Sequence, residues 1–172
     1  LINTKLGAST EISGQSTMLH NGYIASQKHD QTSGLHKTWR KYGTLTIEST
    51  TVHTASKSLK MTPNNASRKL TSAGKNGGFK VAVANGQTAT PTVFVYEDAS
   101  YNGARSRLIL LRNDALGITA DTVLDTATAA SDAAWEGLTG TTAAATDDGV
   151  FEFIVDCDGT AGNLFVDSFS VV

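Results

Sequence analysis

The feature that most constrains the fold of this chain is a repeated unit of strand-like residues followed by a cluster of turn residues. Runs such as TVFVYED (92–98), GVFEFIVDC (149–157) and NLFVDSFSVV (163–172) are rich in β-branched and aromatic residues. About nine to eleven such runs follow one another, and the stretch richest in helix formers, 127–136, is short. Strands without connecting helices favour antiparallel pairing. The sequence therefore predicts an all-β fold, an antiparallel β-sandwich.

The length and polarity of the chain predict a single domain with an arm. The 172 residues fit one sandwich. Residues 1–18 lack aromatic side chains and any strand or helix periodicity, and they are predicted to form an extended N-terminal arm. Residues 19–172 are predicted to form the sandwich, with 18–26 as its first strand. No apolar run is long enough for a membrane-spanning helix, so no membrane partner is expected.

The charges divide between the two halves of the sequence. Residues 1–90 carry 11 Lys or Arg and 3 Asp or Glu, whereas residues 91–172 carry 3 and 13. If the halves interleave in one sandwich, these charges mix; if they segregate, one copy would attract the next head to tail. An acidic half within the same domain would oppose phosphate binding, so no nucleic-acid partner is expected.

Residues that could support catalysis are not grouped in the sequence, and the protein is predicted not to be an enzyme. The four histidines, including His53, all lie in the first third and form no spaced metal motif. Most carboxylate pairs flank turns, where Asp serves the local backbone. Cys157 shares a strand face with Phe151, Phe153 and Val155, which predicts a buried thiol rather than a nucleophile.

Aromatic residues are the candidates for ligand binding, because exposed rings can stack on sugars. An Asn102-Gly103 pair predicts a hairpin between the runs 92–98 and 105–114, with Tyr101 at its tip as the most exposed ring. Core packing is the favoured alternative for Trp135 and for one of the proposed ligand-binding residues, Trp39. The four ring-bearing residues predicted to bind ligand are Trp39, Tyr42, Tyr96 and Tyr101.

The order of motifs resembles the jelly roll of carbohydrate-binding modules, which occurs in glycan-degrading enzymes and in phage capsid decoration or fibre proteins. The resemblance covers residues 19–172. It implies a jelly-roll sandwich in which the last strand lies close to the first. It is carried by LHNGYIAS (19–26), SKSLKM (56–61), GFKVAVANGQTATPTVFVYED (78–98) and FEFIVDCDGTAGNLFVDSFSVV (151–172), with Trp39 and Trp135 between them.

Asp167 is the one charged residue in the final strand. Simple alternation places Leu164 and Val166 on one face, and Phe165, Asp167 and Phe169 on the other. An unpaired carboxylate between aromatic rings is costly to bury, so Asp167 should lie at an edge, accept turn amides or bind a cation.

The resemblance bears on which of these roles Asp167 has. It implies that Asp167 helps to hold a structural calcium beside the first strand, with an acidic partner after Asn21-Gly22-Tyr23. Ile24 and Ala25 stand at that place instead. This favours a hydrogen-bonded Asp167 over a calcium ligand, and no other cofactor is expected.

Two functions remain open at this point. The favoured one is a non-catalytic structural protein of a virus or phage particle, such as a capsid decoration, cement or fibre protein. It would act through contacts with a capsid or other particle protein, as a homo-oligomer (dimer or trimer) located in the virion. The alternative is a carbohydrate-binding module of a secreted enzyme or adhesin, with a glycan as its partner.

Overall fold

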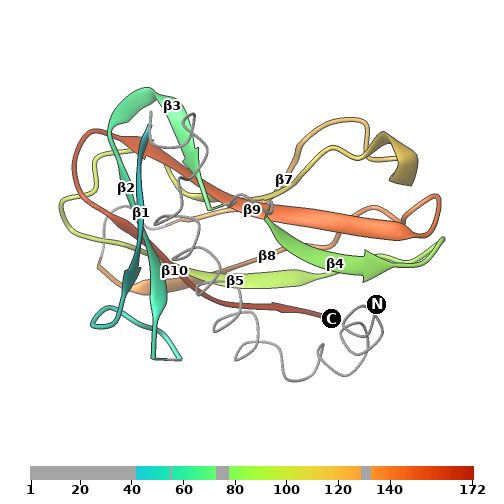
Figure 1. Ribbon diagram of the computed structural model, residues 1–172, viewed down its shortest axis with the longest axis horizontal. Coiled ribbons are helices and arrows are strands. Elements are labelled where there is room, and N and C mark those ends of the chain that lie inside the picture. Colours follow the sequence, from blue (N-terminus) through green and yellow to red (C-terminus); the bar gives the residue numbers. More distant parts are fainter. Residues whose placement is uncertain (1–41, 55, 73–77, 129–132) are drawn as a thin grey trace.

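The computed structural model describes residues 42–54, 56–72, 78–128 and 133–172, and it confirms the predicted all-β sandwich (Figure 1). Besides one short 3₁₀ turn, η3 (Asp114–Leu116), the elements in these ranges are strands. The predicted arm 1–18, the predicted first strand 18–26 and Trp39 lie outside the described residues. The strands are β1 (Gly43–Glu48), β2 (Ser58–Pro63), β3 (Asn65–Thr71), β4 (Phe79–Val83), β5 (Pro91–Glu97), β6 (Arg107–Leu110), β7 (Thr122–Thr126), β8 (Trp135–Thr139), β9 (Gly149–Gly159) and β10 (Leu164–Val171).

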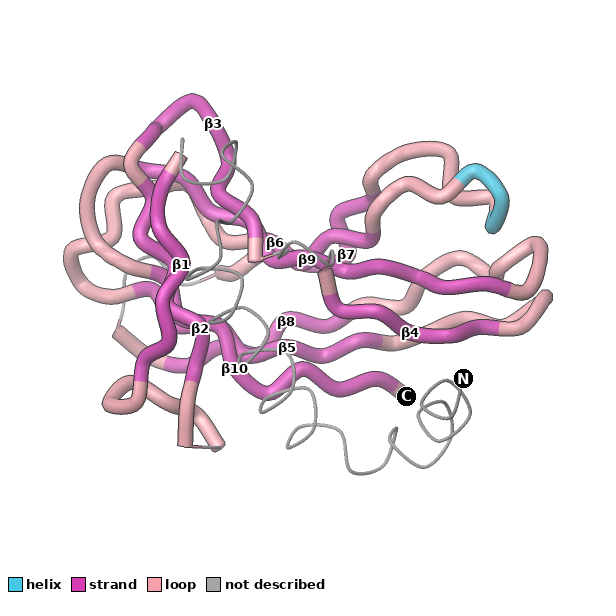
Figure 2. The backbone as a smooth tube through the Cα atoms, in the orientation of Figure 1, coloured by secondary structure: helices cyan, strands magenta, loops and turns pink. Residues whose placement is uncertain are grey.

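The strands form two antiparallel sheets that pack face to face (Figures 1 and 2). The first sheet has the order β1-β2-β10-β5-β8. The second has the order β3-β9-β6-β7, and β4 also pairs with β9. Strands that follow each other in sequence, such as β2 and β3 or β5 and β6, lie in different sheets. This repeated crossing between sheets is the jelly-roll arrangement that the sequence predicted.

Interleaving of the two halves of the sequence follows from this topology. β2 pairs with β10, and β3 pairs with β9, so basic and acidic segments lie side by side. Among the described residues, Lys69 and Asp158 form an ion pair between the halves, with 2.8 Å from Lys69 Nζ to Asp158 Oδ2. The arrangement agrees with mixing of the charges rather than their segregation. No helix in the described part of the chain is long and apolar enough to cross a membrane.

Every second side chain of the central strands enters the core between the sheets. Phe151, Phe153, Val155 and Cys157 of β9 are fully buried there, which confirms the predicted common face. β5 shows the same period, with Val93 and Val95 buried and Phe94 between them half-buried. Because the period of a strand is two, the intervening residues of the first sheet lie on its outer face.

The end of β10 departs from simple alternation. Pairing with β5 shifts register between Asp167 and Ser170, and Ser168 has a left-handed backbone with φ of 55°. An extra residue of this kind reverses the face on which the following side chains lie. Phe169 is therefore in the core, stacked on Phe79 with ring centroids 4.3 Å apart. The prediction that Phe169 shares a face with Phe165 and Asp167 is wrong for this reason.

The turn at Asn102-Gly103 is not a hairpin, so that prediction is also wrong. The strands on either side of it, β5 and β6, belong to different sheets. The Asn102 Oδ1 atom accepts hydrogen bonds from the amides of Thr160 and Ala161, at 2.9 and 3.0 Å. The turn is thus a crossover tied to the β9–β10 connection, since local turn chemistry does not specify which strand the chain meets next.

Candidate functional site

One row of side chains crosses the outer face of the first sheet. Lys60 of β2 is opposite Phe165 of β10, Phe165 is opposite Tyr96 of β5, and Tyr96 is opposite Trp135 of β8. On the other side of Lys60, the row continues to Thr46 of the edge strand β1. Directly opposed residues on one face lie close enough for their side chains to contact. Strand register therefore assembles this row from five separate strands.

The three rings of the row pack against one another. The Tyr96 centroid lies 5.5 Å from that of Trp135 and 5.7 Å from that of Phe165, with tilted and edge-on geometries. Phe165 is buried, at 5% exposed, whereas Tyr96 and Trp135 are half-buried. Edge-on contacts of this kind stabilise an aromatic cluster and fix the planes of its rings. Tyr96 and Trp135 therefore form a fixed apolar surface with part of each ring in solvent.

Polar groups lie beside the rings at one end of β10. The Lys60 Nζ atom is 5.8 Å from the centroid of Phe165, a cation–π contact. Next to it, Thr62 donates to Asn163 Oδ1 at 2.6 Å, and Asn163 Nδ2 donates to Asp98 Oδ2 at 2.7 Å. These contacts place a cation, a hydroxyl, an amide and a carboxylate at one border of the aromatic row.

The carboxylate at this border, Asp98, is held in its charged form. Burial by itself would raise the pKa of Asp98, but hydrogen bonds from Ser100 and Asn163 outweigh burial and lower it. The Ser100 hydroxyl and amide both reach Asp98 Oδ1, at 2.8 and 3.0 Å. Asp98 is thus a fixed hydrogen-bond acceptor rather than a proton donor at neutral pH.

A histidine from outside the sheet completes the aromatic cluster. The His53 imidazole is nearly parallel to the Phe94 ring, with centroids 3.8 Å apart and an angle of 16°. Its centroid is also 5.4 Å from that of Trp135. His53 belongs to the connection between β1 and β2, so this connection folds back over the outer faces of β5 and β8.

Asp167, for which hydrogen bonding was expected over calcium binding, holds this connection in place. It is 2% exposed, and its Oδ2 atom accepts a 2.7 Å hydrogen bond from the His53 backbone amide. Its Oδ1 atom accepts one from the Ser168 hydroxyl at 3.0 Å. Within the described residues, no group of three or more His, Cys, Asp and Glu side chains could hold a metal ion. The expectation that Asp167 accepts turn amides is confirmed.

The residues predicted to bind ligand are dispersed by the fold. Tyr96 lies in the centre of the row, as a binding role requires, and Trp39 lies outside the described residues. Tyr42 is half-buried just before the edge strand β1, which the row crosses four residues later, at Thr46. Ligand binding by Tyr96 and Tyr42 stays a prediction.

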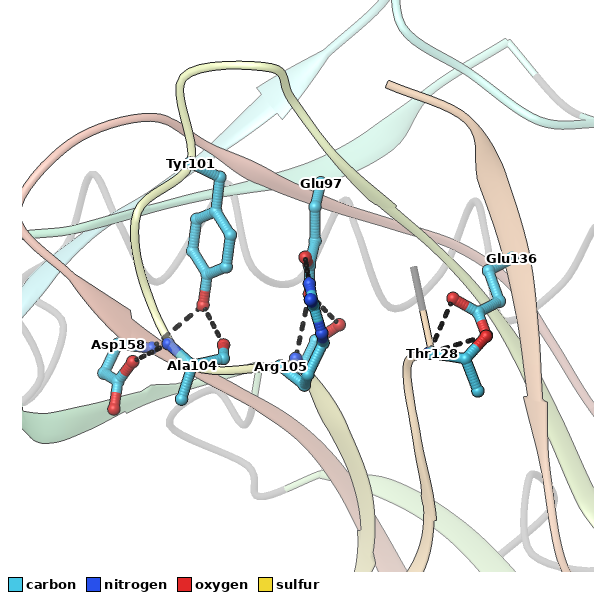
Figure 3. A network of polar contacts seen from close by, with 8 residues as sticks. Glu97, Tyr101, Ala104, Arg105, Thr128, Glu136 and Asp158 are labelled. Atoms are coloured by element: carbon cyan, nitrogen blue, oxygen red, sulfur yellow. Dashed lines mark hydrogen bonds and ion pairs between the residues drawn. The ribbon is translucent and has the colours of Figure 1, made fainter. Parts of the chain in front are cut away.

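The prediction that Tyr101 is the most exposed ring is wrong. Tyr101 is 4% exposed, and its hydroxyl donates to the carbonyl oxygen of Ala104 at 2.7 Å (Figure 3). The Ala104 amide donates to Asp158 Oδ1 at 2.6 Å, which closes a polar network around the ring (Figure 3). Because the 99–104 turn is a crossover packed on β9, its aromatic residue enters the core instead of a hairpin tip.

Sequence reasoning missed most of the residues in this cluster. Trp135 was assigned to the core but is half-buried on the outer face, and Phe94, Phe165 and His53 were not proposed as binding residues. Alternation could have predicted that Phe165 and Phe94 lie on the outer face, since both alternate with residues of the core face. His53 carried no such signal, because its place depends on a hydrogen bond to a residue 114 positions away.

A separate groove lies where β4 approaches the end of β10. None of its lining residues has a titratable side chain. They are Val81, Ala82, Val83, Gly86, Gln87, Thr88, Ala89, Val171 and Val172. The groove therefore offers no charged side chain, and Gln87 and Thr88 are the polar side chains in its lining.

No protein-family model and no curated protein sequence matches the chain. Solved structures with a similar fold include a family 16 carbohydrate-binding module-2, with a TM-score of 0.52 and 15% identity over 82% of this chain and 92% of that one. Another is the CBM22-1–GH10 portion of Clostridium thermocellum endo-1,4-β-D-xylanase 10B in complex with xylohexaose. Its TM-score is 0.51, with 13% identity over 77% of this chain, and this chain spans only 25% of its length.

One similar structure comes from a phage. The enzymatically active domain of bacteriophage CBA120 tailspike protein 4 has a TM-score of 0.50 and 6% identity, over 76% of this chain and 18% of that one. Identities this low establish the fold alone. The strand order of the two sheets and these similarities agree on one conclusion: the chain has a jelly-roll fold of the carbohydrate-binding-module type.

Proposed function

We propose that this protein is a non-catalytic carbohydrate-binding module, and that it binds glycan on the outer face of the first sheet. The observation that carries the proposal is the row from Lys60 to Trp135, in which strand register aligns half-buried rings with polar groups. This revises the preference expected from the sequence, where a particle protein ranked first.

The chemistry of the row suits a sugar better than a protein partner. A pyranose has apolar faces bearing C–H groups and a rim of hydroxyls, so it needs a ring to stack on and polar groups beside that ring. Tyr96 and Trp135 offer the rings, while Lys60, Thr62 and Asn163 offer donors and acceptors nearby. The row crosses strands β2, β10, β5 and β8, a span of roughly 14 Å at the usual strand spacing. A linear glycan lying across the strands would contact several of these groups at once.

Similar folds support a secreted, glycan-binding role. Two of the similar structures are carbohydrate-binding modules, and one was solved with xylohexaose. These proteins define the first polysaccharides to test rather than the ligand of this chain. Under this proposal the protein is extracellular and delivers an attached or partner activity to a polysaccharide.

Affinity gel electrophoresis tests the proposal. The wild-type protein should migrate more slowly in native gels containing one of four soluble polysaccharides: xylan, mixed-linkage β-glucan, galactomannan or polygalacturonate. W135A and Y96A should each remove most of the retardation. V150T, on the exposed surface of the other sheet, is the matched control and should bind as the wild type does. Equal retardation of wild type, W135A and Y96A would contradict the proposal.

The second candidate is a structural protein of a virus or phage particle. The fold similarity to a tailspike domain is the observation that favours it. This candidate expects a dimer or trimer in solution and stoichiometric co-sedimentation with particles. A monomer by light scattering, with glycan binding that depends on Trp135, would count against it.

A further inference from the structure

The segment 49–54, between β1 and β2, has a structure built by its own hydrogen bonds. Glu48 Oε1 accepts the amides of Ser49 and Thr50, at 2.7 and 2.8 Å. The fully buried Ser58 donates its hydroxyl to the carbonyl of Thr51 at 2.6 Å. These bonds form a tight turn, and they aim the following residues back over the sheet.

The far end of the segment is tied to the bulge in β10. The His53 amide donates to Asp167 Oδ2 at 2.7 Å, and the Thr54 hydroxyl is hydrogen-bonded to that of Ser168. Ser168 in turn donates to Asp167 Oδ1 at 3.0 Å. Because the backbone at Ser168 is left-handed, the side chains of Asp167 and Ser168 both lie toward this segment. The buried carboxylate of Asp167 and the hydroxyl of Ser168 thus hold His53 and its neighbour Thr54 in place.

The residue that is fixed in this way is His53, beside the proposed binding face. One face of its ring covers Phe94, and the ring is tilted by 59° relative to Trp135, with centroids 5.4 Å apart. Its Nδ1 atom has a long contact of 3.4 Å with the Thr54 hydroxyl. In the described part of the chain, Nε2 has no hydrogen-bond partner, and the residue is half-buried. The imidazole therefore places a polar group next to Trp135, at the β8 end of the aromatic row.

We infer that His53 is a ligand-contacting residue of the proposed glycan site, and that Asp167 and Ser168 are positioning residues that hold it. The inference rests on the proposed function. A sugar stacked on Trp135 would place a hydroxyl within reach of His53 Nε2, opposite the border formed by Thr62 and Asn163. A neutral imidazole nitrogen can donate to or accept from that hydroxyl. The segment 49–54 then serves as a fixed wall of the site.

The first test separates the polar edge of His53 from its ring. H53F keeps a flat ring that can stack on Phe94 but lacks both nitrogens, whereas H53A removes the ring as well. The dissociation constant for the best-retarded polysaccharide of the four named above is measured by affinity electrophoresis. Loss of one hydrogen bond predicts weakening by about threefold to tenfold in H53F. H53A should weaken binding at least as much, and V150T should not change it.

The second test addresses the positioning residues without disturbing the strand. S168G removes the hydroxyl that ties Thr54, and glycine adopts a positive φ without steric cost. If Ser168 acts through His53, S168G should weaken binding in the wild type but have no further effect in H53F. A merely structural role would lower the melting temperature and would weaken binding equally in both backgrounds.

The outcomes distinguish this inference from the proposed function. Loss of binding in W135A with unchanged binding in H53F would overturn the role of His53 and leave the glycan site standing. Weakening in H53F with equal effects of S168G in both backgrounds would overturn the positioning role. If no polysaccharide retards the wild type, or if W135A binds normally, the proposed function fails and the inference fails with it. Melting temperatures confirm that each variant is folded.

Discussion

The carboxylate of Asp167 accepts the backbone amide of His53 across 114 residues of sequence, at a distance of 2.7 Å. This contact explains why a charged residue stands in the apolar final strand. The carboxylate is almost completely buried, yet both of its oxygens accept hydrogen bonds. A polar group that is buried but hydrogen-bonded costs little, and its removal leaves donors without partners.

Replacement of Asp167 should therefore destabilise the protein without involving a metal. D167A leaves the His53 amide and the Ser168 hydroxyl without their acceptor, and we expect a loss of about 1–3 kcal/mol. D167N keeps one oxygen and should lose less. Urea denaturation, with and without calcium, measures both effects. A wild-type stability that rises strongly with calcium and an unresponsive D167A would show instead that Asp167 binds the ion.

The register shift in β10 predicts that substitutions of neighbouring residues lower the free energy of unfolding by unequal amounts. Phe169 is 3% exposed and stacks on Phe79 in the core, so F169A should lose about 3–5 kcal/mol. S170A, at the half-buried position that follows, is the control and should change stability by less than about 0.5 kcal/mol. A small effect of F169A would mean that Phe169 lies on the outer face, as simple alternation predicts.

The Asp158 carboxylate should stabilise the folded protein at neutral pH, and this stabilisation should be lost in acid. Burial by itself would raise the pKa of Asp158, but the bonds from Lys69 and the Ala104 amide, with the charges of Lys69 and Arg107, lower it. A lowered pKa gives stability above the ordinary value of about 3.9, and that stability is lost as the pH falls through the lowered value.

The test of Asp158 is a comparison of unfolding at pH 7, 5 and 3. D158N should be less stable than wild type at pH 7 and pH 5, and the difference should shrink at pH 3. D147N is the matched control, since Asp147 is exposed and, among the described residues, its side chain accepts one hydrogen bond, from the amide of Asp148. A D158N deficit that is constant over all three pH values would contradict the account.

Cys157 should be inert while the protein is folded. Burial raises the pKa of the thiol, and the nearby charges of Asp156 and Asp158 raise it further. Since the thiolate is the reactive form, a thiol reagent such as DTNB should not modify the native protein. One thiol per chain should react in guanidinium, because Cys157 is the one cysteine in the sequence. Rapid reaction of the native protein would show that β9 opens.

The fold could be predicted because its main determinants are local. Alternation along β9 identified its core face correctly, and the lack of helical segments favoured antiparallel pairing. The errors arose where the structure depends on which strands pair and in which register. The Asn102-Gly103 turn has the residues of a hairpin turn but joins strands of two different sheets. The left-handed backbone at Ser168 shifts the register of β10, and no sequence pattern indicates this shift.

The candidate site was harder to predict because non-local pairing creates it. Lys60, Phe165, Tyr96 and Trp135 become neighbours only through the strand order β2-β10-β5-β8. The spacing of these residues in the sequence does not indicate that they form a row. Tyr101 had the most suggestive local context and is buried, whereas His53 had none and lies beside the row.

The central claim is that glycan binds against Trp135 on the outer face of the first sheet, and the fluorescence of this residue tests it most directly. The chain has two tryptophans, so a W39F variant leaves Trp135 as the sole reporter. Titration with the polysaccharide that retards the wild type should shift the emission of Trp135 to shorter wavelength and protect it from iodide quenching. The change should reach half of its maximum at a concentration equal to the dissociation constant that electrophoresis gives for W39F itself. Binding that leaves the emission and the quenching of Trp135 unchanged would contradict the account.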